Sequence, residues 1–143
     1  MSGGARANMA FWLMKSEPKS YSWDDLVRDG GTQWDGVRNN AARLHLRAMK
    51  PGDLAFLYHS MADKAVVGIM AITGVGEPDG EDGKWVKVPV KPLRPLSRPV
   101  TLAAIKAEPR LAKMELIRQS RLSVAPVRDE EWALVLAMAG ETG

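Results

Sequence analysis

Residues 11–16, with the sequence FWLMKS, restrict the fold of this chain more than any other segment. In an extended chain, Phe11 and Leu13 fall on one face, and Trp12 and Met14 fall on the other. Both faces are therefore largely apolar. Such a strand is typical of the interior of a sheet, so the pattern predicts a central strand.

The segment after this strand predicts a short helix that begins at Ser22. Asp25 stands in the capping-box position three residues later, and a glycine pair ends the helix at Gly30. The apolar residues at helical spacing are Trp23, Leu26 and Val27. Residues 32–38 then predict a short extended piece with a turn around Gly36.

A second helix is predicted over residues 39–50. Its apolar stripe consists of Ala42, Leu46 and Met49. The opposite side carries the basic residues Arg43, Arg47 and Lys50. Two strands are predicted over residues 53–60 and 64–74, with Ala62 and Asp63 at the hairpin between them.

An acidic, glycine-rich loop at residues 77–83 leads into a predicted strand over residues 84–90. The inward-facing residues of that strand are Val86, Val88 and Val90. Trp85 and Lys87 share its other face. Regular structure is not expected again before Val100, because of three prolines: Pro92, Pro95 and Pro99.

The last third of the chain is mainly helical. Two consecutive helices are predicted over residues 101–108 and 109–119, broken at Pro109, and a strand follows over residues 122–127. A closing helix over residues 129–139 packs through Trp132, Val135 and Leu136. Because the helices are interspersed out of βαβ order, the elements predict an α+β protein: a small mixed β-barrel surrounded by helices.

The composition fits one compact domain. The chain has 143 residues, of which 45% are hydrophobic and 26% are charged. We predict a flexible tail over residues 1–9 and a single domain over residues 10–140. The net charge of +3 is a mild preference for polyanions.

The same composition restricts the compartment and the cofactors. Absence of cysteine excludes disulfides and thiolate metal sites, and it fits a reducing interior. Two histidines, His45 and His59, are too few for a histidine-based zinc site. No apolar run approaches the ~20 residues of a membrane span. We therefore expect a cytoplasmic protein with no metal, no cofactor and no membrane contact.

The familiar catalytic signatures are missing. Ser16 has no G-x-S-x-G context, and Gly74-Val75-Gly76 lies between two predicted strands instead of opening a helix. The residues alone therefore argue for no enzyme.

Two local clusters remain, at residues 15–18 and 34–39. The second sets Trp34 beside Asp35, Arg38 and Asn39, which combines a plate for stacking a base with donors and acceptors for the base edge. The structural alternative places Trp34 in the core, with Asp35 capping a turn and Asn39 capping the helix. On residue chemistry alone, that alternative is the commoner one.

Five ordered segments resemble the EVE domain, the family of the thymocyte nuclear protein and its bacterial relatives. They are WLMKSEP, YSWDDLVRDG, WDGVRN, LRAMKPGDLAFLYHS and RQSRLSVAPV. The resemblance covers residues 10–140 and implies a PUA-like β-barrel related to the YTH domains, which read methylated adenine in RNA. It implies a reader of modified bases in DNA or RNA, with modified cytosine in DNA as the usual proposal, and neither catalysis nor a cofactor.

The resemblance also implies which residues contact the base. Lys15 and Ser16 match the strand that lines the family's pocket, and Trp34 and Asp35 match a cage aromatic and its polar neighbour in YTH domains. The other candidates from matching motifs are Arg38, Asn39, His59, Ser60, Arg121 and Ser123. We expect Trp12 or Trp85 to close the other side of the base, and Arg43, Arg47 and Lys50 to contact phosphates.

Two departures affect specificity. Many relatives have Tyr-Gln where this chain has Asn40 and Ala41, and many have a longer acidic insertion at residues 77–83. Two other functions stay open. One is an enzyme acting on a nucleotide or RNA, with Lys15, Asp35 or His59 as acid/base groups. The other is a structural or protein-binding role.

Overall fold

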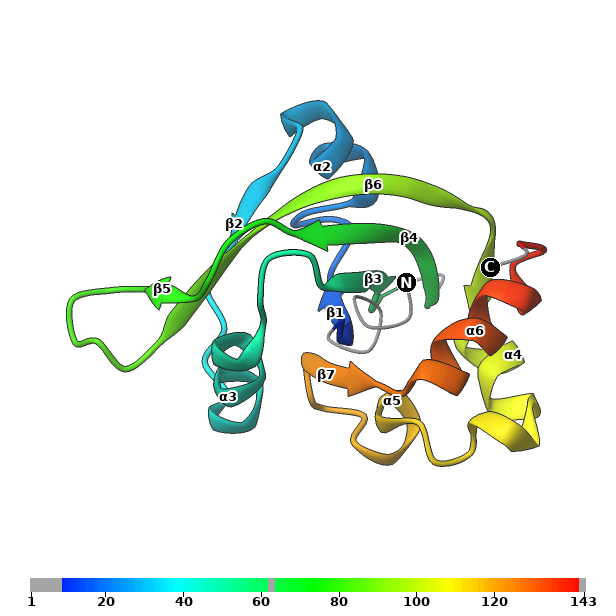
Figure 1. Ribbon diagram of the computed structural model, residues 1–143. Coiled ribbons are helices and arrows are strands. Elements are labelled where there is room, and N and C mark those ends of the chain that lie inside the picture. Colours follow the sequence, from blue (N-terminus) through cyan, green and yellow to red (C-terminus); the bar gives the residue numbers. More distant parts are fainter. Residues whose placement is uncertain (1–8, 62–63, 142–143) are drawn as a thin grey trace, which may run out of the picture.

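The computed structural model of the protein describes residues 9–61 and 64–141 (Figure 1). The predicted hairpin residues Ala62 and Asp63 and most of the predicted tail lie outside the described residues. Within the described chain, one strongly curved sheet of seven strands forms a half-barrel with helices around it. This confirms the prediction of an α+β protein with a mixed barrel-like sheet, although we expected fewer strands.

The first strand, β1 (Phe11–Ser16), lies inside the sheet as predicted. It pairs in parallel with β3 (Leu54–His59) and antiparallel with β7 (Val124–Val127). Trp12 and Met14 contribute to one buried cluster, and Phe11 and Leu13 to another. The alternation read from the sequence therefore supplies two hydrophobic cores, one on each face of the sheet.

The remaining strands continue the sheet away from β1. They are β2 (Thr32–Trp34), β4 (Ala65–Ile72), β5 (Glu77–Pro78) and β6 (Val86–Thr101). The order across the sheet is β2-β6-β4-β3-β1-β7, and β5 pairs with β6 to form a hairpin that projects from the molecule. The predicted inward residues Val86, Val88 and Val90 are all buried.

The prediction that prolines prevent regular structure before Val100 is wrong. Strand β6 runs through all three prolines and pairs with β4 along its length. From Val100 to Pro95, β6 advances five positions while β4 advances two, from Val66 to Gly68. Irregular register of this kind tolerates residues that cannot donate to the ladder, because the bulged positions have no ladder partner.

The helices lie around the sheet edges. They are α2 (Trp23–Asp29), α3 (Asn40–Ala48), α4 (Leu102–Ala107), the 3-10 helix η1 (Pro109–Leu111), α5 (Glu115–Arg118) and α6 (Asp129–Met138). The capping box of Ser22 and Asp25 on α2 is confirmed, and Gly30 ends that helix with φ of 71°. Val27, expected on the apolar stripe of α2, is 51% exposed.

The single helix predicted over residues 109–119 is also wrong. The structure has the short η1 and α5 instead, separated by extended backbone at Met114 (φ −62°, ψ 138°). Met114 is fully buried, so packing of its side chain favours the break over a continuous helix. Helix α6 packs as predicted, with the Trp132 ring stacked on Phe11 and Phe56 at centroid distances of 4.3 and 3.9 Å.

Candidate functional site

A cavity of about 390 Å³ lies where β1 ends, bordered by the segment before α2 and by β2 with the turn that follows it. Six predicted base-binding residues line it: Lys15, Ser16, Trp34, Asp35, Arg38 and Ser123. Seven others also line it: Glu17, Ser20, Tyr21, Thr32, Gln33, Gly36 and Val37. The two clusters found in the sequence are therefore brought together in one pocket.

The end of β1 contributes a half-buried ammonium and a hydroxyl. Lys15 Nζ donates to the carbonyl oxygen of Ser120 at 2.7 Å, and burial lowers the pKa of this lysine. Ser16 Oγ donates to the carbonyl oxygen of Tyr21 at 2.6 Å, which ties the strand to the segment before α2. This wall therefore combines a cation with a fixed hydroxyl.

Strand β2 places Trp34 at the opposite wall. Its side chain is 8% exposed and belongs to the core cluster as well as to the pocket lining. The structural interpretation of Trp34 and the binding interpretation are therefore both compatible with its position. Asp35, next in sequence, is exposed at the pocket.

The turn after Trp34 is held by an acidic residue from the β5–β6 hairpin. Gly36, with φ of 75°, donates its amide to Asp79 Oδ2 at 2.9 Å, and Arg38 Nη1 contacts the same oxygen at 3.0 Å. The Gly36 amide and then the Arg38 guanidinium lower the pKa of Asp79. Only glycine adopts this backbone conformation without strain, so Gly36 permits the turn.

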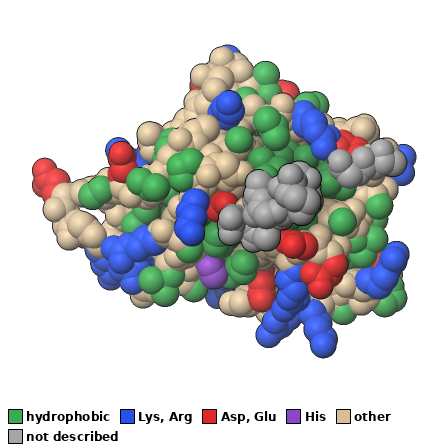
Figure 2. All heavy atoms as spheres, viewed as in Figure 1, with side chains coloured by type: hydrophobic (Ala, Val, Ile, Leu, Met, Phe, Trp, Pro, Cys, Tyr) green, Lys and Arg blue, Asp and Glu red, His purple; other side chains and the backbone are tan. Residues whose placement is uncertain are grey.

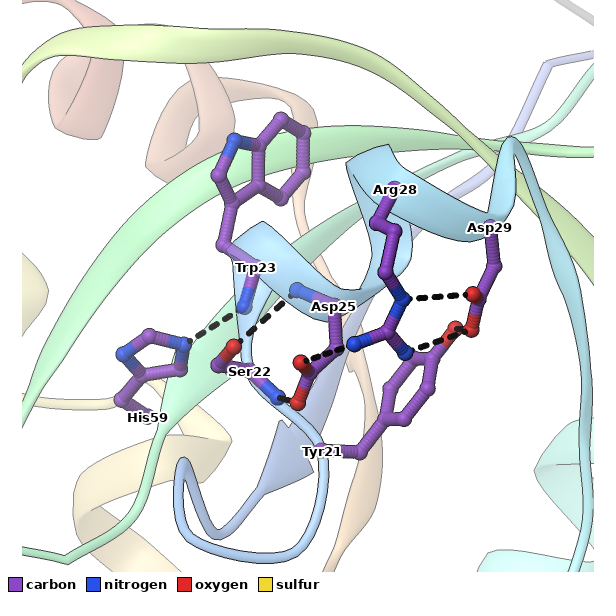
Figure 3. A network of polar contacts seen from close by, with 7 residues as sticks. All are labelled: Tyr21, Ser22, Trp23, Asp25, Arg28, Asp29 and His59. Carbon is purple, nitrogen blue, oxygen red and sulfur yellow. Dashed lines mark hydrogen bonds and ion pairs between the residues drawn. The ribbon is translucent and has the colours of Figure 1, made fainter.

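Tyr21 stands at the start of a polar network that orders α2 (Figure 3). Its hydroxyl donates to Asp29 Oδ2 at 2.8 Å, and Arg28 bonds both Asp29 and Asp25. At the helix N-terminus, the Trp23 amide donates to His59 Nε2 at 3.1 Å. The Tyr21 ring is thereby held at the pocket from both ends of α2.

Metal chemistry has no support in the structure. Among residues 9–61 and 64–141, no three histidine, aspartate or glutamate side chains are grouped so that they could hold a metal ion. No helix in the described part of the chain is long and apolar enough to cross a membrane.

The sequence model of the EVE domain matches residues 10–138. The chain belongs to the EVE domain family. Thymocyte nuclear protein 1 of Gallus gallus is 34% identical to this EVE domain over 178 residues, covering 98% of this chain and 74% of that protein.

Solved structures agree with this EVE assignment. An NMR structure of a Rhodopseudomonas palustris protein is 54% identical, with a TM-score of 0.88, covering 92% of this chain and 94% of that one. The crystal structure of human THYN1 in complex with 5-methylcytosine containing DNA is 34% identical, with a TM-score of 0.87 and coverage of 94% and 99%. The fold expected from the resemblance is therefore that of solved relatives.

Two tryptophans predicted to close the EVE pocket lie elsewhere. Trp12 is 6% exposed in the core, and its indole Nε1 donates to Asp53 Oδ2 at 3.0 Å. Trp85 lies on the β5–β6 hairpin, outside the pocket lining and against Arg38. The aromatic residue that joins Trp34 in the lining is Tyr21, which sequence reasoning missed although it directly precedes the helix cap.

His59 and Ser60 are also outside the pocket lining. His59 accepts a hydrogen bond from α2 and lines a separate hollow with Lys64 and Lys106. Desolvation lowers the pKa of His59, although the Asp24 charge opposes the shift. Ser60 donates its amide to the carbonyl oxygen of Ser16 and so continues the pairing of β1 with β3.

Asn39 and Arg121 line a shallower hollow of about 340 Å³ with Ser120. The Asn39 side chain accepts from the Ala42 amide at 2.9 Å, so Asn39 caps α3, as the structural alternative predicted. The basic residues Arg43, Arg47 and Lys50 follow the side of α3 away from its buried stripe, and Arg47 and Lys50 are exposed.

Proposed function

We propose that this EVE domain is a non-catalytic reader that binds DNA carrying a modified cytosine and holds the extruded base in the pocket. The observation that carries the proposal is the pocket lining, which sets the rings of Trp34 and Tyr21 among Lys15, Ser16 and Asp35. A volume of about 390 Å³ suits a nucleobase with part of its sugar. The human relative solved with 5-methylcytosine containing DNA supports the same ligand class.

The energetics require both stacking and edge contacts. Extruding a base costs a few kcal/mol, and stacking on an aromatic ring returns about 1–3 kcal/mol per base. The carboxylate of Asp35, which accepts, and the ammonium of Lys15, which donates, would supply the remaining preference at the base edge. Arg43, Arg47 and Lys50 would add salt-sensitive contacts to the strand phosphates.

The test is fluorescence anisotropy with matched oligonucleotides bearing cytosine, 5-methylcytosine or methyladenine, as DNA and as RNA, at two salt concentrations. We expect a preference for 5-methylcytosine in DNA that persists at the higher salt. Equal and salt-sensitive binding to every oligonucleotide would leave only a basic surface and reject the reader.

Tyr21 is the better residue for a pocket variant. Trp34→Ala would remove a buried core residue and cost about 3–5 kcal/mol of stability, which confuses unfolding with lost binding. Tyr21→Leu removes a half-buried ring from the lining, and Tyr21→Phe is its matched control because the ring stays while the Asp29 hydrogen bond is lost. We expect Tyr21→Leu to lose the base preference and Tyr21→Phe to keep it.

A second candidate is an enzyme acting on the bound nucleotide, with Lys15 as the base. The lowered pKa of Lys15 is the observation that favours it. Of the other acid/base candidates, Asp35 shares the pocket, whereas His59 is outside its lining. Mass spectrometry of the modified oligonucleotide after prolonged incubation decides between the two, since a reader leaves its mass unchanged.

A further inference from the structure

Three cations surround the half-exposed ring of Trp85. Lys84 Nζ lies 4.7 Å from the ring centroid, Arg38 Cζ 5.4 Å and Arg43 Cζ 6.0 Å. These four residues, here named the Trp85 cluster, come from the β5–β6 hairpin, the turn after β2, and α3. Figure 2 shows lysine and arginine side chains gathered where the start of β6 meets α3.

The Trp85 cluster has more positive charge than its protein partners balance. In the described part of the chain, Asp79 pairs with Arg38, but neither Arg43 nor Lys84 has a carboxylate within ion-pair distance. Arg43 Nη1 donates to the carbonyl oxygen of Lys84 at 3.3 Å, and its buried Nε has no partner among the described residues. Cations held this close repel one another unless an anion joins them.

The acidic residues of the hairpin do not remove this excess. Asp82 is used by the backbone, because its Oδ1 accepts from the Lys84 amide at 3.1 Å, and Glu77 lies opposite Lys87 in the β5–β6 pair. In Figure 2, the acidic side chains on this side of the molecule lie at the hairpin tip and along its upper edge, separate from the basic patch.

The cluster is continuous with the pocket through Arg38, which belongs to both. We infer that the Trp85 cluster binds the sugar-phosphate backbone of a nucleic acid strand next to the nucleotide whose base enters the pocket. Trp85 is the positioning residue: its ring face orders the three cations, because a cation above an indole is attracted by the ring quadrupole. The place of the phosphates beside the pocket rests on the proposed function, whereas anion binding by the cluster does not.

The test measures the dissociation constant of a labelled duplex with one central 5-methylcytosine, and of the unmodified duplex, over a series of NaCl concentrations. Each lost phosphate contact lowers the slope of log K against log salt by about 0.9 for duplex DNA. We expect the double variant Arg43→Gln/Lys84→Gln to lower the slope by about 1.8 with both duplexes and to keep the ratio of their affinities. The charge-matched control is Lys106→Gln/Lys113→Gln, near α4 and η1, away from the hairpin.

A slope decrease no larger than that of the control would overturn the inference. Trp85→Leu should lower the slope, and Trp85→Phe should restore most of it because a ring face returns. Equal slopes for Trp85→Leu, Trp85→Phe and wild type would remove Trp85 from the cluster's function. If wild type does not distinguish the two duplexes, the base reader fails while the slopes still decide on the phosphate contacts. Thermal unfolding by circular dichroism checks that each variant is folded.

Discussion

The carboxylate of Asp79 accepts a hydrogen bond from the backbone amide of Gly36 at 2.9 Å, although the two residues are 43 positions apart in the chain. The same oxygen contacts Arg38 at 3.0 Å. The acidic loop before β6 therefore fixes the turn that borders the pocket. A loop that the sequence marked only as a shortened insertion thus helps to shape the candidate site.

Asp79→Ala should weaken DNA binding without unfolding the protein. Loss of these contacts frees the turn, and the cost is about 1 kcal/mol after allowance for solvent exposure of the pair. That corresponds to about fivefold in affinity for the 5-methylcytosine duplex. The matched control is Asp82→Ala, which removes a carboxylate from the same loop but no pocket contact. Equal affinities for the two variants would show that the turn does not depend on Asp79.

Asp53 should be one of the most sensitive positions for stability. It is 2% exposed and accepts from the Ala10 amide, the Trp12 indole and the Lys50 amide. Asp53→Ala leaves buried donors without partners, at about 1–3 kcal/mol for each group. We expect urea unfolding to show a loss of at least about 3 kcal/mol, against little change for Glu81→Ala at the exposed hairpin tip. A loss below about 1 kcal/mol would mean that water replaces the carboxylate.

His59 should make stability depend on pH. Its Nε2 accepts from the Trp23 amide, so protonation breaks this bond, and burial lowers its pKa below the ordinary 6.5. The unfolded chain then binds the proton more readily, so stability falls as pH decreases below about 6.5. His45 has a lowered pKa from burial and contributes with the same sign.

Unfolding free energies at pH 7.5 and 5.8 separate the two histidines. We expect His59→Gln and His45→Gln each to remove part of the decrease, and the double variant to remove most of it. An unchanged decrease in His59→Gln would exclude His59 as its source.

Gly68→Ala should destabilise the protein through Trp23. A methyl group at Gly68 would lie 2.5 Å from Trp23 Cζ3, and a rigid ring cannot move aside cheaply. Overpacking of this kind costs about 1–3 kcal/mol. The double variant Gly68→Ala/Trp23→Leu tests the cause, because its loss should be smaller than the sum of the single losses. Additive losses would point to backbone strain at Gly68 instead.

Local patterns predicted much of the fold correctly. The alternation in FWLMKS indicated a strand with two apolar faces, and Ser22 with Asp25 indicated the start of α2. These features are set by neighbours in the chain, so the sequence contains them directly. The same holds for Asn39, whose cap on α3 was one of two interpretations left open.

The errors all concern choices that distant residues make. Prolines in β6 were expected to end the strand, but pairing with β4 carries it through Thr101 by way of irregular register. Trp12 and Trp85 were expected at the pocket because they are aromatic. The buried carboxylate of Asp53 holds Trp12 in the core instead, and Trp85 stands among cations on the hairpin.

The sequence by itself determined the family, most strands and helices, and six residues of the pocket lining. Only the tertiary structure decided that Tyr21 joins Trp34 there and that Asp79 holds the turn beside them. The physical reason is that side chains acquire partners across the sheet only after the strands pair. Residue type alone does not determine whether an aromatic ring or a carboxylate will face the pocket, the core or the surface.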